Sequence, residues 1–183
     1  MRIRGFFIQH EIMKIQLATF ENLPQIIEII EEAKIHLASL HIDQWQNGYP
    51  NAEQIEKDIK NNESYVVLNA DNQMVATAMF TTNKESTYNE IEGDWEISVN
   101  KTYGVVHRMA IKKKFLQRGL ATAILEEFHK QLKHRNIQSL KIDTHEDNLG
   151  MQALLKKLDY KYCGIIHTDY GAKRLAYEKV ILI

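Results

Sequence analysis

The chain has 183 residues, 44% hydrophobic and 26% charged, a size and balance typical of one globular domain with room for a core. Its net charge of −1 gives no overall basic field, and no apolar run approaches the roughly 20 residues of a membrane span, so we expect neither a nucleic-acid nor a membrane partner. The single cysteine, Cys163, cannot form an internal disulfide; this is usual in a reducing compartment, and we expect a cytoplasmic protein.

Residues 1–12 contain an apolar segment shorter than the roughly 7–15 residues of a signal-peptide core. The first strand of the fold is expected to begin near residue 13. We therefore interpret 1–12 as an N-terminal extension and 13–183 as a single domain. A short strand or a dimer arm is the alternative interpretation of the extension.

The first half of the domain alternates apolar and polar residues in patterns typical of strands and helices. The patterns predict strands over 14–18, 65–69 and 74–81 and helices over 22–40 and 51–61. Turn-forming residues between the second and third strands predict a hairpin. The polar, acid-rich stretch 83–101 is either a long loop or a loose hairpin over one end of the sheet.

The second half begins with an apolar strand and a strongly amphipathic helix. The predicted elements are strands over 105–111, 139–144, 160–167 and 174–181 and helices over 118–135 and 148–158. The strand over 105–111, its helix and the next strand form a right-handed parallel unit, whereas the remaining strands pair antiparallel. The sequence therefore predicts an α/β protein with a mixed sheet.

A basic turn, Lys112-Lys113-Lys114-Phe115-Leu116-Gln117, joins that strand to the amphipathic helix. The unpaired N–H groups and positive dipole end of a helix N-terminus favour a phosphate. Gly119 and Ala121 leave room for a ligand to approach the backbone. The turn has neither glycine pattern of the common nucleotide-binding motifs. We expect a phosphorylated ligand at the carboxyl end of the parallel strands; an ordinary basic turn is the alternative.

This order of elements, with a basic turn after the fourth strand, resembles the GNAT superfamily of acyl-CoA-dependent N-acyltransferases. The family's turn has the pattern Arg/Gln-x-x-Gly-x-Gly/Ala, and residues 116–121 match it at Gly119 and Ala121. Leu116 stands where the family has Arg or Gln. The resemblance implies a central twisted mixed sheet with a splayed parallel strand pair, flanked by about four helices.

A second family segment is an Asn, a short helix and then Gly-Phe, and it corresponds to Asn148 and to Asp159-Tyr160. Many members place a Tyr four residues before that Gly as the general acid for the leaving thiolate, and Leu155 occupies this place. The departure leaves a second hypothesis open, a CoA-binding sensor or interaction module without catalysis. A Rossmann-type nucleotide binder is a third.

The resemblance implies an acetyl-CoA-dependent N-acetyltransferase in which the primary amine of a small molecule attacks the thioester directly, through a tetrahedral intermediate. Backbone N–H groups of the turn would hold the pyrophosphate, and the backbone N–H of Met109 would stabilise the oxyanion. The implied cofactor-binding residues are Met109, Ile111, Leu116, Gln117, Arg118, Gly119, Leu120, Ala121, Thr122, Asn148 and Lys156. Members of the family are often dimers, so a homodimer stays open.

The amine arrives as an ammonium ion and needs a general base. His107 is the first candidate, because it lies two residues before Met109 and shares its face on an ideal strand. Asp143 and His145 are two residues apart on the next strand, so they are the second candidate, as an oriented carboxylate–imidazole pair. The alternatives are a structural histidine and a pair that fixes the following loop.

Two aromatic residues, Trp45 and Tyr49, lie in the loop between the first two predicted helices. In the family this loop often lines the acceptor side, so both are candidate substrate-binding residues; an anchor for the loop is the alternative. The chain has neither a His-Glu-x-x-His motif nor paired cysteines, so we expect no metal.

Overall fold

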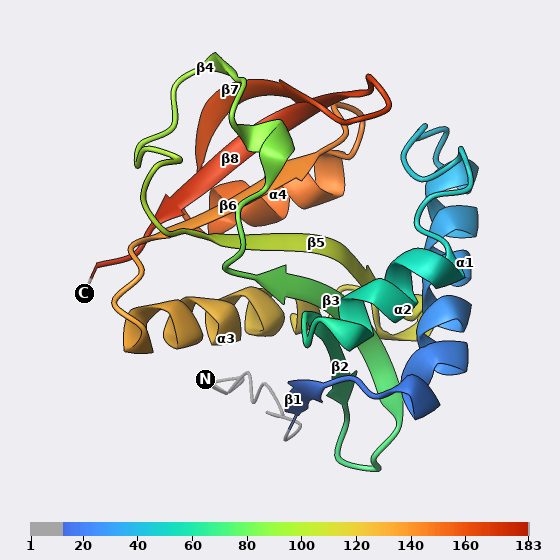
Figure 1. Ribbon diagram of the computed structural model, residues 1–183. Helices are drawn as coiled ribbons and strands as arrows, with labels where there is room; N and C mark the ends of the chain where they lie inside the picture. Colours follow the sequence, from blue (N-terminus) through green and yellow to red (C-terminus); the bar gives the residue numbers. More distant parts are fainter. Residues whose placement is uncertain (1–12, 183) are drawn as a thin grey trace, which may run out of the picture.

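The computed structural model describes residues 13–182, so the expected extension over 1–12 lies outside the described residues (Figure 1). The strands are β1 (Lys14–Leu17), β2 (Ser64–Leu68), β3 (Met74–Thr81), β4 (Glu92–Gly93), β5 (Gly104–Ile111), β6 (Ser139–Thr144), β7 (Lys161–His167) and β8 (Lys173–Val180). The helices are α1 (Leu23–Ser39), α2 (Ala52–Lys60), α3 (Leu120–His134) and α4 (Leu149–Lys157), with short 3-10 turns η1 (Phe20–Asn22), η2 (Ser86–Tyr88) and η3 (Lys113–Phe115).

The eight strands form one mixed sheet in the order β1-β2-β3-β5-β6-β8-β7-β4. Only β5 and β6 run parallel among the described strand pairs, and α3 connects them. The prediction of an α/β mixed sheet with one parallel unit and four helices is confirmed.

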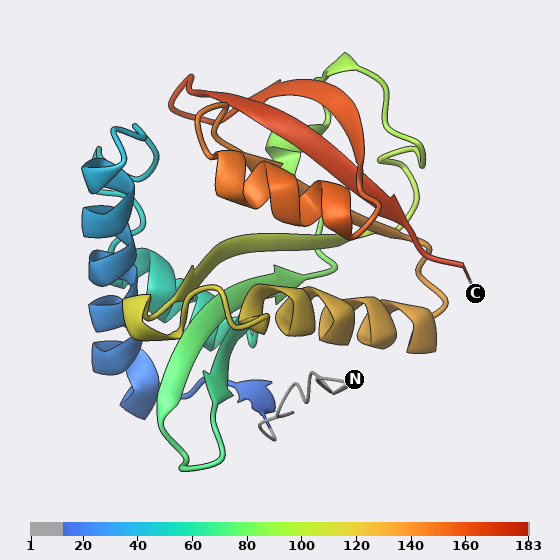
Figure 2. The same ribbon diagram turned by 180° about the vertical axis from the view of Figure 1, so that it is seen from behind.

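Helices cover both faces of the sheet (Figures 1 and 2). On one face, α1 and α2 bury Ile26, Ile29 and Ile55 against β2 and β5. On the other, α3 and α4 pack into the largest core cluster, where Phe128 stacks on Phe80 with ring centroids 4.4 Å apart. The periodic apolar stripe of each helix supplies these contacts, because burying it removes apolar surface from water. No helix of the described chain has the length and apolar character that a membrane crossing requires.

The parallel pair separates soon after it starts. Paired positions join β5 and β6 only at Gly104 with Leu140 and at Val105 with Lys141, although both strands continue well beyond these residues. The two halves of the sheet therefore diverge at the carboxyl ends of β5 and β6. Along the chain, α3 begins shortly after β5 ends, past the turn that contains η3.

The stretch 83–101 is mostly loop, with the turn η2 and the two-residue strand β4 that pairs with β7. A fully buried ion pair fixes the position of this stretch. The Lys141 Nζ lies 2.8 Å from the Glu178 Oε1 and donates to the Ile97 carbonyl at 2.8 Å. The second Glu178 oxygen accepts the Glu96 N–H at 2.7 Å. Long-range side-chain contacts rather than local pattern therefore decide this segment's path over the sheet.

Candidate active site

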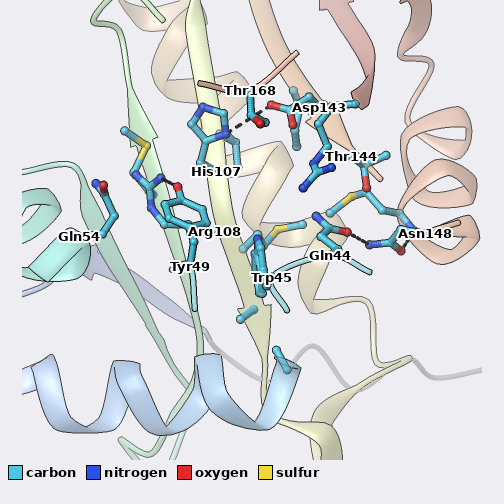
Figure 3. A pocket seen from close by; sticks show the side chains of 18 of the residues that line it. Gln44, Trp45, Tyr49, Gln54, His107, Arg108, Asp143, Thr144, Asn148 and Thr168 are labelled. Carbon is cyan, nitrogen blue, oxygen red and sulfur yellow. Dashed lines mark hydrogen bonds and ion pairs between the residues drawn. The ribbon is translucent and has the colours of Figure 1, made fainter. Parts of the chain in front are cut away.

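A cavity of about 780 Å³ opens where the sheet divides. Its walls come from both halves of the sheet and from the elements around the opening (Figure 3). They are α1, the α1–α2 loop, α2, the end of β3 and the segment after it, the second half of β5, the turn that leads into α3, the end of β6, the N-terminal part of α4, and the β7–β8 turn with the adjoining strand ends. Nine of the residues that the sequence marked for a role line it: Trp45, Tyr49, His107, Met109, Ile111, Leu116, Ala121, Asp143 and Asn148. The structure thus gathers candidates for cofactor, acceptor and proton transfer around one space.

His107 lies between two carboxylates. Its Nε2 is 3.1 Å from the Glu85 Oε2, and its Nδ1 is 3.6 Å from the Asp143 Oδ1. Figure 3 shows the imidazole pointing toward Asp143 across the opening between β5 and β6. The Tyr88 hydroxyl donates to the same Asp143 oxygen at 2.7 Å. The side chains of His107 and both carboxylates are partly exposed to the cavity, so a ligand can reach the imidazole.

The charges of this group follow from its contacts. The hydrogen bond from His107 is the largest influence on Glu85 and lowers the pKa of its carboxyl to about 2. Glu85 is therefore ionised at any neutral pH. Burial, followed by the charge of Asp143, raises the pKa of the Tyr88 hydroxyl well above its usual value, so Tyr88 stays a neutral donor. The arrangement presents an imidazole within an acidic surrounding, which attracts a cation.

The expected pair of Asp143 with His145 is wrong. Asp143 pairs with His107 and Tyr88, whereas His145 turns its Nδ1 to Asp147, accepting the Asp147 N–H at 3.1 Å. Strand β6 ends at Thr144, so the two-residue alternation of a strand does not carry on to His145.

His107 and Met109 also lie on opposite faces, because β5 carries a bulge. The register with β3 passes from His107 opposite Met79 to Ala110 opposite Thr77, and Arg108 has a left-handed φ of 52°. One extra residue in β5 reverses the alternation. Met109 consequently packs against the core cluster of α3, while His107 faces Glu85. Their shared-face prediction is wrong, although both line the cavity.

The bulge also turns Arg108 toward α2. Its Nε and Nη2 bind the two oxygens of Asp58 at 2.7 and 2.9 Å, and its Nη1 donates to the Tyr49 hydroxyl. Asp58 is buried; that burial is the largest influence on its carboxyl and raises its pKa, and the Arg108 charge opposes this. Tyr49 therefore both lines the cavity and ties the α1–α2 loop to β5 (Figure 3).

The turn before α3 exposes a row of backbone donors. Gln117 and Gly119 have left-handed φ values of 61° and 81°, and Gly119 is the N-cap of α3. Among the described residues, no acceptor is bonded to the N–H groups of residues 117–122. A Cβ at Gly119 would meet nothing within 4 Å. Free N–H groups on open space at a positive helix end make an anion site.

The remaining predicted cofactor residues occupy different environments. Asn148 caps α4 by accepting the Met151 N–H at 3.1 Å, and its Nδ2 donates to Gln44 at 2.9 Å across the cavity (Figure 3). Leu120 is buried beneath the turn. Gln117, Arg118, Thr122 and Lys156 lie outside the cavity lining, and all but Thr122 are exposed. Helix α3 begins at Leu120, so Arg118 belongs to the turn and not to the helix.

Sequence reasoning did not single out Glu85, Tyr88, Arg108 or Asp58 as site residues. Glu85 stood only within the acid-rich stretch 83–101, whose path depends on the distant Lys141–Glu178 pair. An arginine on an apolar strand is the signal that points to Arg108, because a buried charge requires a partner. Within residues 13–182, no three His, Cys, Asp or Glu side chains are grouped to hold a metal ion.

A mixed sheet with a splayed parallel pair, and a helix N-terminus of free N–H groups beside it, defines the fold class of the acyl-CoA-dependent transferases. The family model described as "Acetyltransferase (GNAT) family" matches residues 25–160. The chain therefore belongs to the GNAT acetyltransferase family, in which transfer of an acetyl group from acetyl-CoA is general. The resemblance stated from the sequence is confirmed.

Solved structures agree with this assignment. A GNAT-family acetyltransferase from Streptococcus agalactiae is 36% identical with a TM-score of 0.83, covering 93% of this chain and 96% of its own. A GNAT-family acetyltransferase from Listeria monocytogenes is 14% identical with a TM-score of 0.73, covering 92% and 94%. The PaiA N-acetyltransferase of Thermoplasma acidophilum, solved with coenzyme A, is 17% identical with a TM-score of 0.66, covering 92% and 99%. The latter two show the fold alone. No curated protein matches significantly.

Proposed function

We propose that this protein is an acetyl-CoA-dependent N-acetyltransferase that modifies the primary amine of a small molecule, with residues 13–183 acting as one domain. The observation that carries the proposal is the position of His107. It lies between Glu85 and Asp143 on the same cavity that Leu116 and Ala121 of the α3 turn border. A base and a cofactor site thus share one space, as direct transfer requires.

The described residues fit acetyl-CoA. The free N–H groups of residues 117–122 suit the pyrophosphate, and Gly119 has no side chain to obstruct it. The opening between β5 and β6 suits the acyl-bearing arm, because beyond Val105 and Lys141 neither strand pairs with the other there. Arg108 and Met109 have no paired residue on β3, so the bulge leaves the Met109 backbone at the opening as our choice for the oxyanion donor.

The chemistry then follows from the cavity's charges. Glu85 and Asp143 attract the substrate ammonium, and His107 accepts its proton. The free amine attacks the thioester carbon, so that a C–N bond forms while the Met109 N–H stabilises the tetrahedral oxyanion. The nitrogen then loses its second proton to water, and collapse of the intermediate breaks the C–S bond. Leu155 is fully buried where many members have a Tyr, so we assign protonation of the departing thiolate to water.

A titration with acetyl-CoA, followed by a panel of amines read by thiol release, tests this function. We expect selective binding over ATP and NAD, and turnover with at least one amine. His107→Ala should bind acetyl-CoA as the parent does, yet lose about 100- to 10,000-fold in turnover, the usual contribution of a general base. His134→Ala, an exposed histidine in the last turn of α3, is the matched control. Unchanged turnover in His107→Ala would move the proposed base to Asp143.

Leu155 and Leu116 favour a second candidate, a CoA-binding sensor without catalysis, since each replaces a family residue of known chemistry. The same experiment separates the two functions. Acetyl-CoA binding without thiol release from any amine, unaltered in His107→Ala, would establish the sensor. Thiol release that depends on His107 would exclude it.

A further inference from the structure

The cavity contains a buried cation without an anionic partner. Arg174, on β8, is only 5% exposed and lines the cavity. Its Nη1 donates to the Lys173 carbonyl at 2.8 Å and its Nη2 to the Tyr170 hydroxyl at 3.1 Å. No ion pair of the described residues includes Arg174. A charge removed from water without an opposite charge is costly, so this one suits an anion supplied by a ligand.

The guanidinium keeps donors for such a ligand. Its Nε donates to no acceptor of the described residues, and yet it is not among the polar atoms sealed from solvent without a partner. Part of the Nε surface is therefore accessible. The planar fork of a guanidinium binds a carboxylate through two parallel N–H bonds. By contrast, Arg108, the other buried arginine of the cavity, already donates to Asp58 through Nε and Nη2 and to Tyr49 through Nη1.

The strand register places Arg174 on the face of the sheet that carries the proposed base. Asp143 of β6 lies opposite Ala176 of β8, and Arg174 precedes Ala176 by two residues. Residues two apart on a strand share a face and are about 7 Å apart along it. Ile166, opposite Arg174 on β7, packs in the same cluster as Ala176 and Tyr88. Arg174 therefore lies on the same face as Asp143, two residues along β8 from the residue that pairs with Asp143.

The two ends of this face have opposite charges. Two carboxylates, Glu85 and Asp143, surround His107 at one end, and the Arg174 guanidinium lies at the other. We propose that the acceptor is an amino acid whose ammonium binds beside His107 and whose free carboxylate binds Arg174. This assignment rests on the proposed N-acetyltransferase function and names its substrate class. Tyr170 accepts a hydrogen bond from Arg174, and its ring lies 6.3 Å from that of Tyr49 between centroids, so it lies beside the carboxylate end.

Matched substrate pairs test the assignment on the unaltered protein. Glycine, β-alanine and γ-aminobutyrate are compared with their carboxamides at saturating acetyl-CoA, with rates corrected for the fraction of free amine at the assay pH. We expect at least one amino acid to exceed its amide about 10- to 100-fold in kcat/KM, the range of a charge-assisted hydrogen bond pair. Equal use of acids and amides would overturn the assignment, and the preferred chain length reports the spacing.

Variants locate the effect. Arg174→Gln should bring the ratio of kcat/KM for an amino acid to that for its amide down to about one, and Arg174→Lys should keep part of the preference for the acid. Arg135→Gln, at the exposed end of α3, is the matched control and should keep all of it. An Arg174→Gln protein that still prefers the acid would refute the proposal.

Equilibrium binding keeps the two proposals separate. If no amine is turned over, the N-acetyltransferase function fails, but titration of an amino acid and its amide into the protein with CoA still measures the Arg174 site. Tighter binding of the acid, lost in Arg174→Gln, would support the site on its own. Equal binding would reject it.

Discussion

The two sides of the cavity use different parts of the chain. On the proposed cofactor side, residues 116–122, the available contacts are backbone N–H groups in an exposed turn. On the proposed acceptor side, formed by Glu85, His107, Arg108, Asp143 and Arg174, the contacts are ionisable side chains from four distant segments. Backbone donors tolerate variation such as Leu116, because any residue supplies an N–H. A side-chain network, however, depends on each of its members. We therefore expect most side-chain substitutions to matter little on the first side and a great deal on the second.

The largest effect should come from obstructing the backbone site. Gly119→Glu adds bulk and negative charge where the pyrophosphate would bind, and like-charge contact costs several kcal/mol. We expect at least about 1,000-fold weaker acetyl-CoA binding in a calorimetric titration. Gly171→Glu is a matched control, since Gly171 has a φ of +80° against +81° for Gly119, and a Cβ at either position meets nothing within 4 Å. Equal loss in both variants would attribute the effect to backbone strain.

On the acceptor side, removing one partner of a buried pair should destabilise the fold. Asp58→Ala leaves the Arg108 guanidinium buried without its carboxylate; this typically costs about 3–5 kcal/mol. Urea unfolding measures the loss, with Asp71→Ala in the exposed β2–β3 turn as the control. The double variant Asp58→Ala/Arg108→Met should recover part of the stability. A double variant as unstable as the sum of the singles would contradict pairwise dependence.

A smaller effect concerns the stability of α3, the helix that follows the proposed cofactor turn. The His129 Nε2 lies 2.7 Å from the Tyr160 hydroxyl, and burial lowers the pKa of His129 from 6.5 to about 4. Between these values the unfolded chain binds a proton that the folded chain does not, so stability falls as the pH drops from 6.5 to 4. His129 is partly exposed, so we expect a contribution on the order of 2 kcal/mol after solvent screening.

Unfolding titrations of His129→Gln across this range provide the test. The variant should lose about that much less stability on acidification, because its amide does not titrate. Acetyl-CoA affinity at neutral pH should not change, since the backbone donors of α3 remain. A variant with the same pH dependence as the parent would remove His129 from the explanation.

The smallest effect should follow from restoring the family residue at the turn. Leu116→Arg adds one partly exposed cation beside the backbone donors, worth roughly 1 kcal/mol or less. We expect acetyl-CoA to bind less than about fivefold tighter, with a larger gain at low ionic strength. Leu116→Gln, without the charge, is the control. A gain of 100-fold would mean that the cofactor side relies on side chains after all.

Much of the cofactor side could be read from the sequence because its signals are local. The apolar strand, the turn with Gly119 and the periodic stripe of α3 are adjacent in the chain, and each follows from short-range geometry. Their order along the chain also indicated the parallel unit and the family, and the family model matches. Roles of individual cofactor residues, such as Asn148 and Lys156, remain predictions.

The acceptor side depended on contacts that no local pattern carries. The bulge at Arg108 arises from pairing with β3, and it separated His107 from Met109. Asp143 joined His107 rather than His145 because β6 ends at Thr144 and the imidazole crosses the opening from β5. The sequence by itself determined the strands, helices and glycine turn, since these obey spacing rules within a few residues. Only the tertiary structure decided which charges meet, because their segments are brought together by the sheet.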